Sequence, residues 1–315
     1  MRIVSLLASA TEIVCALDCG HMLVGRSHEC DNPAWVRQLP CCSDPAFDIT
    51  GSSGAIDAEV RRRLHAGEPL YQIHTDVIRA LEPDLVITQM HCDVCAVTAA
   101  EVERTGACAH SAKQIALSAS SIEGIFNSIR LVAEALGVAE RGEALVRSEQ
   151  QRLQAIAEKT SHLRRRSVGM IEWTDPVYVM ANWAPELVEF ANGEPVLGRK
   201  GQHSTAMDGS GLLEADPEYL IVAPCGFNLE RSLAEQSRLE EYPWWGQLQA
   251  VRSGNVAFAD GNLFFNRAGM TMAQTAEIIA EILHGVDSAN DSHTHWHRME
   301  APVTESEGLP MRSSF

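Results

Sequence analysis

The stretch from Thr88 to Val97, TQMHCDVCAV, combines a His-Cys pair with a Cys-x-x-Cys spacing directly after an apolar run. Such residues could bind a metal through imidazole and thiolate, or carry thiol redox chemistry. A ribbon-type zinc site needs a second Cys-x-x-Cys, which the sequence lacks, and Asp93 opposes formation of a thiolate. The alternative is that Cys92 and Cys95 pack as small apolar residues in a tight turn at the mouth of a ligand cleft.

Other catalytic signatures are absent from the sequence. It has no Gly-x-Gly-x-x-Gly, no P-loop and no Gly-x-Ser-x-Gly elbow, and no carboxylate pair stands out among its forty-two acidic residues. The formal net charge of −17 argues against binding to nucleic acid or anionic lipid. The sequence contains no run of eighteen apolar residues, so it predicts no membrane-spanning helix. The sequence therefore favours a non-enzymatic binding protein.

The elements that would position these residues alternate between strand and helix, which predicts an α/β fold. LEPDLVITQMHC and EADPEYLIVAPC each place a cysteine just past an apolar strand, which favours two related lobes. Between the halves, apolar residues at helical spacing predict one long connecting helix. The expected organisation is an N-terminal lobe at 1–115, a connecting helix at 118–160, a C-terminal lobe at 166–285 and a disordered tail at 286–315.

Ligands of open α/β sheets bind beyond the carboxyl ends of the strands. The segments expected there are HECDNP, TQMHCDVCAV, EWTDPVYVMANW, APCGFN and DGNLFFNRAG. Trp173, Phe264 and Phe265 follow second-lobe strands, and an aromatic lining suits a large, flat, partly apolar ligand.

Six phrases in register between about residues 2 and 285 resemble the cobalamin-binding, BtuF-like branch of the class III substrate-binding proteins of ABC importers. They are RIVSLLASATEIVCALDCG, RSHECDNP, LEPDLVITQMHCDVCAV, EWTDPVYVMANWAPELVEFANG, APCGFNLER and DGNLFFNRAG. The resemblance implies two Rossmann-like lobes with parallel sheets, joined by one long helix. It also implies that cobalamin or a related corrinoid is the bound ligand, held in the cleft without catalysis.

The resemblance carries specific residues into the expected site. The ligand-contacting residues that it implies are Glu29, His91, Cys92, Trp173, Phe264, Phe265 and Arg267. His91, or alternatively His28, is our candidate axial ligand for cobalt, since imidazole suits such metals. Two rival functions remain open: binding of haem or a ferric siderophore, and a thiol- or metal-dependent enzyme built on His91, Cys92 and Cys95.

The same family docks onto a permease through one acid on each lobe. Asp76 falls at the first position, whereas the second position holds Ser210 with Asp208 nearby. The N-terminal stretch MRIVSLLASATEIV reads as the start of the fold rather than as a signal peptide, and no lipid-anchor cysteine follows. Nine cysteines, an odd number, favour a reducing compartment. We therefore expect a cytoplasmic protein, with periplasmic export by an unmarked route as the alternative.

Overall fold

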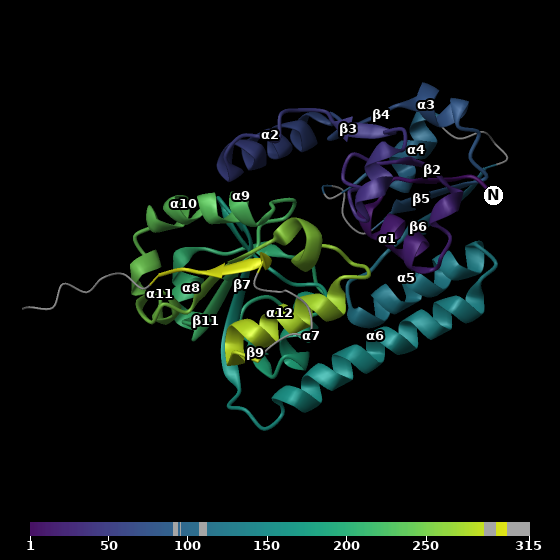
Figure 1. Ribbon diagram of the computed structural model, residues 1–315. Helices are drawn as coiled ribbons and strands as arrows, with labels where there is room; N and C mark the ends of the chain where they lie inside the picture. The colour runs from purple at the N-terminus through teal and green to yellow at the C-terminus, as the bar shows by residue number, and fades with distance from the viewer. Residues whose placement is uncertain (91–93, 95, 107–111, 287–293, 301–315) are drawn as a thin grey trace, which may run out of the picture.

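The computed structural model describes residues 1–90, 94, 96–106, 112–286 and 294–300. Two α/β lobes lie side by side, and a pair of helices runs along both of them (Figure 1). This arrangement confirms the two-lobed α/β fold expected from the sequence. No helix among the described residues is both long and apolar enough to cross a membrane.

The N-terminal lobe is built on a four-stranded sheet with the order β2-β1-β5-β6, in which every neighbouring pair is parallel. All five residues of β5 are buried, as expected for a central parallel strand. The lobe contains β1 (Ile3–Ser5), α1 (Ala8–Ala16), η1 (Gly20–Met22), β2 (Leu23–Arg26), η2 (Ala34–Gln38), β3 (Ser43–Pro45), α2 (Ser53–Ala66), β4 (Tyr71–Ile73), α3 (Thr75–Ala80), β5 (Leu85–Gln89), α4 (Ala99–Thr105) and β6 (Lys113–Leu117).

The C-terminal lobe has a seven-stranded sheet. Its strands β7, β11 and β12 are parallel neighbours, β9 pairs in parallel with β7, and β8, β10 and β13 are antiparallel additions. The lobe contains β7 (Arg166–Thr174), β8 (Val177–Val179), α7 (Ala184–Phe190), β9 (Gly193–Pro195), β10 (Thr205–Ala206), α8 (Gly209–Ala215), β11 (Tyr219–Val222), α9 (Leu229–Ala234), α10 (Gln236–Glu240), η3 (Trp245–Gln247), α11 (Gln249–Arg252), β12 (Val256–Ala259), η4 (Gly261–Phe265), α12 (Met272–His284) and β13 (Trp296–Arg298).

The prediction of a single connecting helix at 118–160 is wrong, because the structure has two helices there. α5 (Ile122–Ala135) ends before Gly137, whose φ of +73° suits glycine, and α6 (Ala139–Thr160) runs back beside it (Figure 1). Gly142 lies where the two helices touch, since a Cβ there would come within 2.5 Å of the Ala133 Cβ. One glycine therefore makes the turn and the other permits the close approach.

The disordered tail expected at 286–315 is also partly wrong. Residues 296–298 form β13, which pairs antiparallel with β12 at the edge of the second sheet. Met299 is buried in the core of that lobe, and the His295 ring lies 4.5 Å from the Phe264 ring. The strand was missed because three residues are too few to show a period of their own, and only the partner strand defines them.

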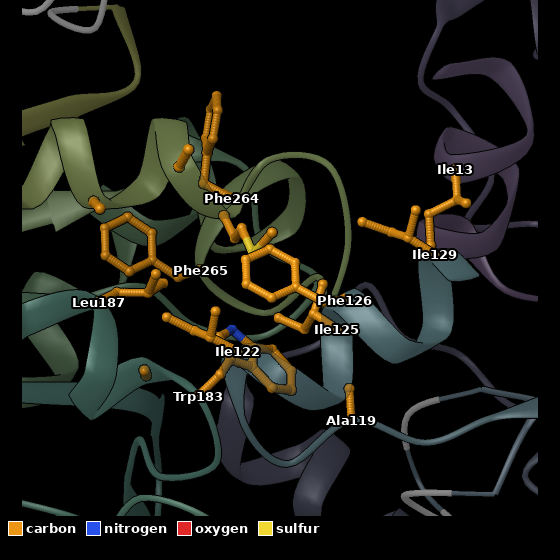
Figure 2. Packing of buried hydrophobic residues seen from close by; sticks show 14 of the residues in the cluster. Ile13, Ala119, Ile122, Ile125, Phe126, Ile129, Trp183, Leu187, Phe264 and Phe265 are labelled. Atoms are coloured by element: carbon orange, nitrogen blue, oxygen red, sulfur yellow. The ribbon is translucent and has the colours of Figure 1, made fainter. Parts of the chain in front are cut away.

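The hydrophobic core is continuous between the lobes. α5 supplies the link: Ile129 lies near Ile13 of α1, whereas Ile122 lies near Trp183 and Leu187 of the second lobe (Figure 2). The Ile122 amide also donates to the Glu186 carboxylate at 2.9 Å. Because one helix buries apolar side chains in both lobes, their relative position is fixed by packing rather than by a flexible linker.

Candidate ligand site between the lobes

A polar cavity of about 510 Å³ opens between the two lobes. Its walls come from the chain after β2, β11 and β12, at the carboxyl ends of parallel strands in both sheets. The polar lining residues are Asp31, Asn32, Arg37, Asn228, Arg231, Asp260 and Asn262. Three of the five segments expected at strand ends, HECDNP, APCGFN and DGNLFFNRAG, therefore meet at this cavity.

Arg267 joins the lobes behind this cavity. Its guanidinium donates to the Glu12 carboxylate of α1 and to the Asp31 carboxylate, both at 2.7 Å, and to the Asn262 side-chain oxygen at 3.1 Å. Arg267 is only 7 % exposed. Burial raises the pKa of Glu12, and Arg267 opposes that rise. Since its donors are committed within the protein, Arg267 positions the cavity wall rather than offering a free cation to a ligand.

Glu29 lies on the first-lobe side, next to His28. The Glu29 side chain is 36 % exposed, yet desolvation raises its pKa to about 7, with Arg267 opposing and Asp31 reinforcing the rise. Burial of the carboxyl favours its neutral form, which is why the pKa rises. Burial lowers the pKa of His28, and Asp44 opposes this effect. The lowered pKa favours a neutral imidazole at neutral pH.

An aromatic and apolar surface continues from His28. The His28 and Tyr71 rings lie 5.4 Å apart, and the Tyr71 hydroxyl donates to the Val94 carbonyl at 2.6 Å. Met90 follows directly after β5 and is 67 % exposed, which is unusual for a large apolar side chain. Val94 is 39 % exposed, so Met90 and Val94 together present apolar surface just after the central strand, here named the first-lobe wall.

Trp173 lies at the end of β7, as expected, but another part of the chain covers it. Its indole nitrogen donates to the carbonyl oxygens of Ser53 at 3.2 Å and Asp175 at 3.1 Å. The ring packs edge-on against Phe227 with 5.1 Å between centroids. In this structure, the first-lobe residue Ser53 thus occupies the polar edge that a ligand would otherwise contact.

The expectation that Phe264 and Phe265 line the ligand site is corrected by the structure. Both are 2 % exposed and belong to the continuous core, where the Phe265 ring lies beside Leu187 (Figure 2) and the Phe264 ring packs against His295. The π-helical turn Gly261–Phe265 directs them inward, with Asp260 accepting from the amides of Asn262 and Leu263. The residues of this loop that line the cavity are instead Asp260, Asn262 and Leu263.

The cysteine-rich motif is only partly described. His91, Cys92 and Cys95 lie outside the described residues, so the metal and thiol hypotheses stay untested there. Among the residues that are described, no cluster of three or more His, Cys, Asp or Glu could hold a metal ion. Burial raises the pKa of Cys15 to about 11 and that of Cys42 to about 12, so neither is a ready nucleophile.

The two candidate docking acids are exposed on different lobes. Asp76 lies in the first turn of α3 and its side chain is 99 % exposed. Asp208 caps α8, accepting hydrogen bonds from the Ser210 hydroxyl and the Gly211 amide, which lower its pKa. Asp208 therefore stabilises the start of α8. The Asp76 carboxylate lies 3.8 Å from the Arg79 guanidinium, which is a long ion pair.

Sequence reasoning missed Arg231 and the three cavity asparagines as individual site residues. Arg231 lies 3.6 Å over the Phe227 ring and donates to the carbonyl oxygens of Ile49 and Gly51 in the first lobe. The available signal was position: Asn32, Asn228 and Asn262 all fall inside phrases quoted as strand ends. Their residue type alone did not separate them from other surface amides.

Comparisons with known protein families and solved structures identify relatives of this two-lobed fold. The profile of a family described as periplasmic binding protein matches residues 3–263. No curated protein sequence matches the chain.

Solved structures share the fold at low sequence identity. An ABC transporter substrate-binding protein from Listeria monocytogenes EGD-e aligns with TM-score 0.67 and 18% identity over 90% of this chain and 99% of that one. A periplasmic heme binding protein from Pseudomonas aeruginosa gives TM-score 0.67 and 18% identity, covering 96% and 95%. The periplasmic vitamin B12 binding protein BtuF of Vibrio cholerae gives 0.65 and 18%, covering 90% and 96%.

Proposed function

The chain belongs to the periplasmic binding protein family, and from that premise we propose that it binds cobalamin or a related corrinoid between its lobes, without converting it chemically. Fold likeness to the vitamin B12 binding protein supports a ligand of this kind, and likeness to haem binders supports a flat macrocycle more generally. The choice of a corrinoid rests on the chemistry of the cavity.

The observation that carries the proposal is the balance of polar groups in the cavity. It offers two acids, two arginines and three amides, so no single sign of charge dominates. Arg37 lies 3.6 Å from the Asp31 carboxylate, and Arg231 donates to backbone carbonyls. Both cations are thus already partnered. A periphery of neutral amides, as in a corrinoid, fits this lining better than the carboxylates of haem or of an anionic siderophore.

The first-lobe wall suits the face of the ring. Met90 and Val94 present apolar surface, and the Val94 carbonyl accepts from the Tyr71 hydroxyl. The His28 ring lies 5.4 Å from the Tyr71 ring and has a lowered pKa, and we propose His28, as an alternative to His91, for the axial ligand of the bound cobalt. Replacement of His28 by Ala is expected to change the visible spectrum of bound hydroxocobalamin if this imidazole is the ligand.

Titration of the purified full chain with hydroxocobalamin and cyanocobalamin, by calorimetry and absorbance, tests the proposal. A parallel titration with haemin distinguishes cobalamin binding from haem binding. Asn228→Asp keeps a residue that can cap α9 but replaces an amide in the cavity by a carboxylate, so it should weaken cobalamin binding. Asn255→Asp is the matched control, because Asn255 contacts Arg298 instead. Absence of saturable cobalamin binding up to tens of micromolar would exclude this function.

We also propose that Asp76 and Asp208 contact a permease, as the family resemblance suggests. Asp76→Lys places a cation at an exposed position with one long internal contact, so folding should be unaffected. Asp208→Asn should keep the α8 cap while removing the charge. Loss of co-purification with a permease in both variants, with cobalamin binding retained, is the expected result; unchanged co-purification would rule out this docking mode.

A further inference from the structure

One segment of the first lobe leaves that lobe and lies against the second. This segment, here named the arm, comprises residues 46–70 between β3 and β4 and carries α2. The short antiparallel β3–β4 pair holds its base, and α2 extends over the second lobe above α9 (Figure 1). The arm therefore bridges the two lobes beside the cavity, because Arg231 of the cavity lining donates to the Ile49 and Gly51 carbonyl oxygens of the arm.

A buried polar cluster holds the start of α2 on the second lobe. The Ser53 hydroxyl donates to the Glu235 carboxylate at 2.6 Å and accepts from the Thr174 hydroxyl at 2.9 Å. Thr174 also contacts the same Glu235 oxygen. All three residues are buried, and Ser53 comes from the other lobe. Removal of the arm would leave the buried Glu235 carboxylate without the Ser53 donor, and only its contact with Thr174 would remain.

The arm covers the aromatic end of β7. The Ser53 carbonyl accepts from the Trp173 indole at 3.2 Å, and the next residue, Gly54, faces Asp175. A Cβ on Gly54 would lie only 2.3 Å from the Asp175 Oδ2. Asp175 is itself held by Arg238 at 2.5 Å. Glycine at this position thus permits the arm to approach the strand end closely.

Beyond its first turn, helix α2 is held loosely. Ser53 and Ile56 are the only buried residues of the fourteen in α2. There, the Arg61 guanidinium reaches the second lobe and donates to the Tyr178 hydroxyl at 3.4 Å. A helix with so little buried apolar surface can separate from its support at low free energy without unfolding of either sheet.

We propose that the arm is a lid on the ligand site, that it opens to admit and release the ligand, and that Ser53 is the residue that holds it closed. This inference rests on the proposed function and concerns access to the same cleft. A corrinoid exceeds the drug-sized molecules that occupy pockets of roughly 300–1,000 Å³. The cavity of about 510 Å³ is therefore too small for it until the surface around Trp173 is uncovered.

A reversible cross-link tests the lid directly. The ideal Cβ of Gly54 lies 3.6 Å from the Asp175 Cβ, within the range that a disulfide spans. Oxidised Gly54→Cys/Asp175→Cys should bind hydroxocobalamin at least about tenfold more slowly than the same protein after reduction. The two single-cysteine variants are the controls for loss of the glycine and of the Asp175 carboxylate. Equal association rates for the oxidised and reduced forms would refute the lid.

Hydrogen exchange tests the arm without any ligand. Amides of α2 should exchange at least about tenfold faster than those of β7, and Ser53→Ala should accelerate α2 further. Ser237→Ala, on the exposed surface of α10, should leave α2 unchanged. If the amides of α2 and β7 exchange at the same rate, the lid proposal is wrong, even if the protein binds cobalamin. If reduced protein binds no cobalamin, the proposed function fails, and the exchange data still decide whether the arm opens.

Discussion

Arg267 of the C-terminal lobe and Glu12 of the N-terminal lobe form an ion pair with 2.7 Å between nitrogen and oxygen, and their side chains are only 6 % and 2 % exposed. The second Glu12 oxygen is buried without a hydrogen-bond partner. The pair thus fixes the lobes to each other next to the cavity, and it depends on both members being present.

Removal of Arg267 is expected to be strongly destabilising. Arg267→Met leaves the Glu12 carboxylate buried without its cation, which should lower the free energy of unfolding by about 3–5 kcal/mol. Glu12→Gln combined with Arg267→Met should recover part of that loss. The control Arg164→Ala, which breaks an exposed pair with Glu218, should cost about 0–1 kcal/mol. Chemical denaturation measures all three, and a loss below about 1 kcal/mol for Arg267→Met would contradict the assigned role.

Glu29 should make stability depend on pH. Folding raises its pKa from 4.5 to about 7, so its contribution is fully present below 4.5 and is lost as the pH rises through about 7. The folded protein should therefore lose stability relative to Glu29→Gln between about pH 5 and about pH 8. Urea denaturation of the natural chain and of Glu29→Gln at about pH 5 and about pH 8 measures this loss of stability. Glu194→Gln, at the exposed position of β9, serves as the control, and parallel pH profiles for Glu29→Gln and the natural chain would contradict the shift.

Phe265 should behave as a core residue. Phe265→Ala removes a side chain that is 2 % exposed, and loss of such a group costs about 3–5 kcal/mol through lost burial and the cavity left behind. Leu131→Ala, on the exposed face of α5, should cost far less. Thermal unfolding compares the two. A Phe265→Ala protein of normal stability with selectively weakened cobalamin binding would restore the ligand-contact role first expected for it.

The short strand β13 should contribute to folding. Met299 directly follows it and is buried in the second-lobe core, so Met299→Ala should lower the free energy of unfolding by about 2–5 kcal/mol. Met90→Ala provides a matched control, since that side chain is largely exposed and its loss should leave stability within about 0.5 kcal/mol. Equal stability of the two variants would mean that β13 is dispensable.

The sequence by itself determined the α/β class and the principal strands. β5 and β11, which carry the two similar phrases, occupy equivalent places, each next to the first strand of its own lobe. Continuous apolar runs mark such strands because both of their faces are buried, and this property is local to the run. The same local signal indicated that strand-end segments would form the cavity.

Only the tertiary structure decided what those segments do. Trp173 lies at the end of a strand and Phe265 follows one, yet the arm contacts the first and the second packs in the core, because contacts from distant residues determine which face is open. The Arg267–Glu12 pair joins positions 255 residues apart, and Ser53 meets Glu235 across 182 residues. Such pairings leave no periodic trace in a single sequence, since each depends on how the two lobes pack together.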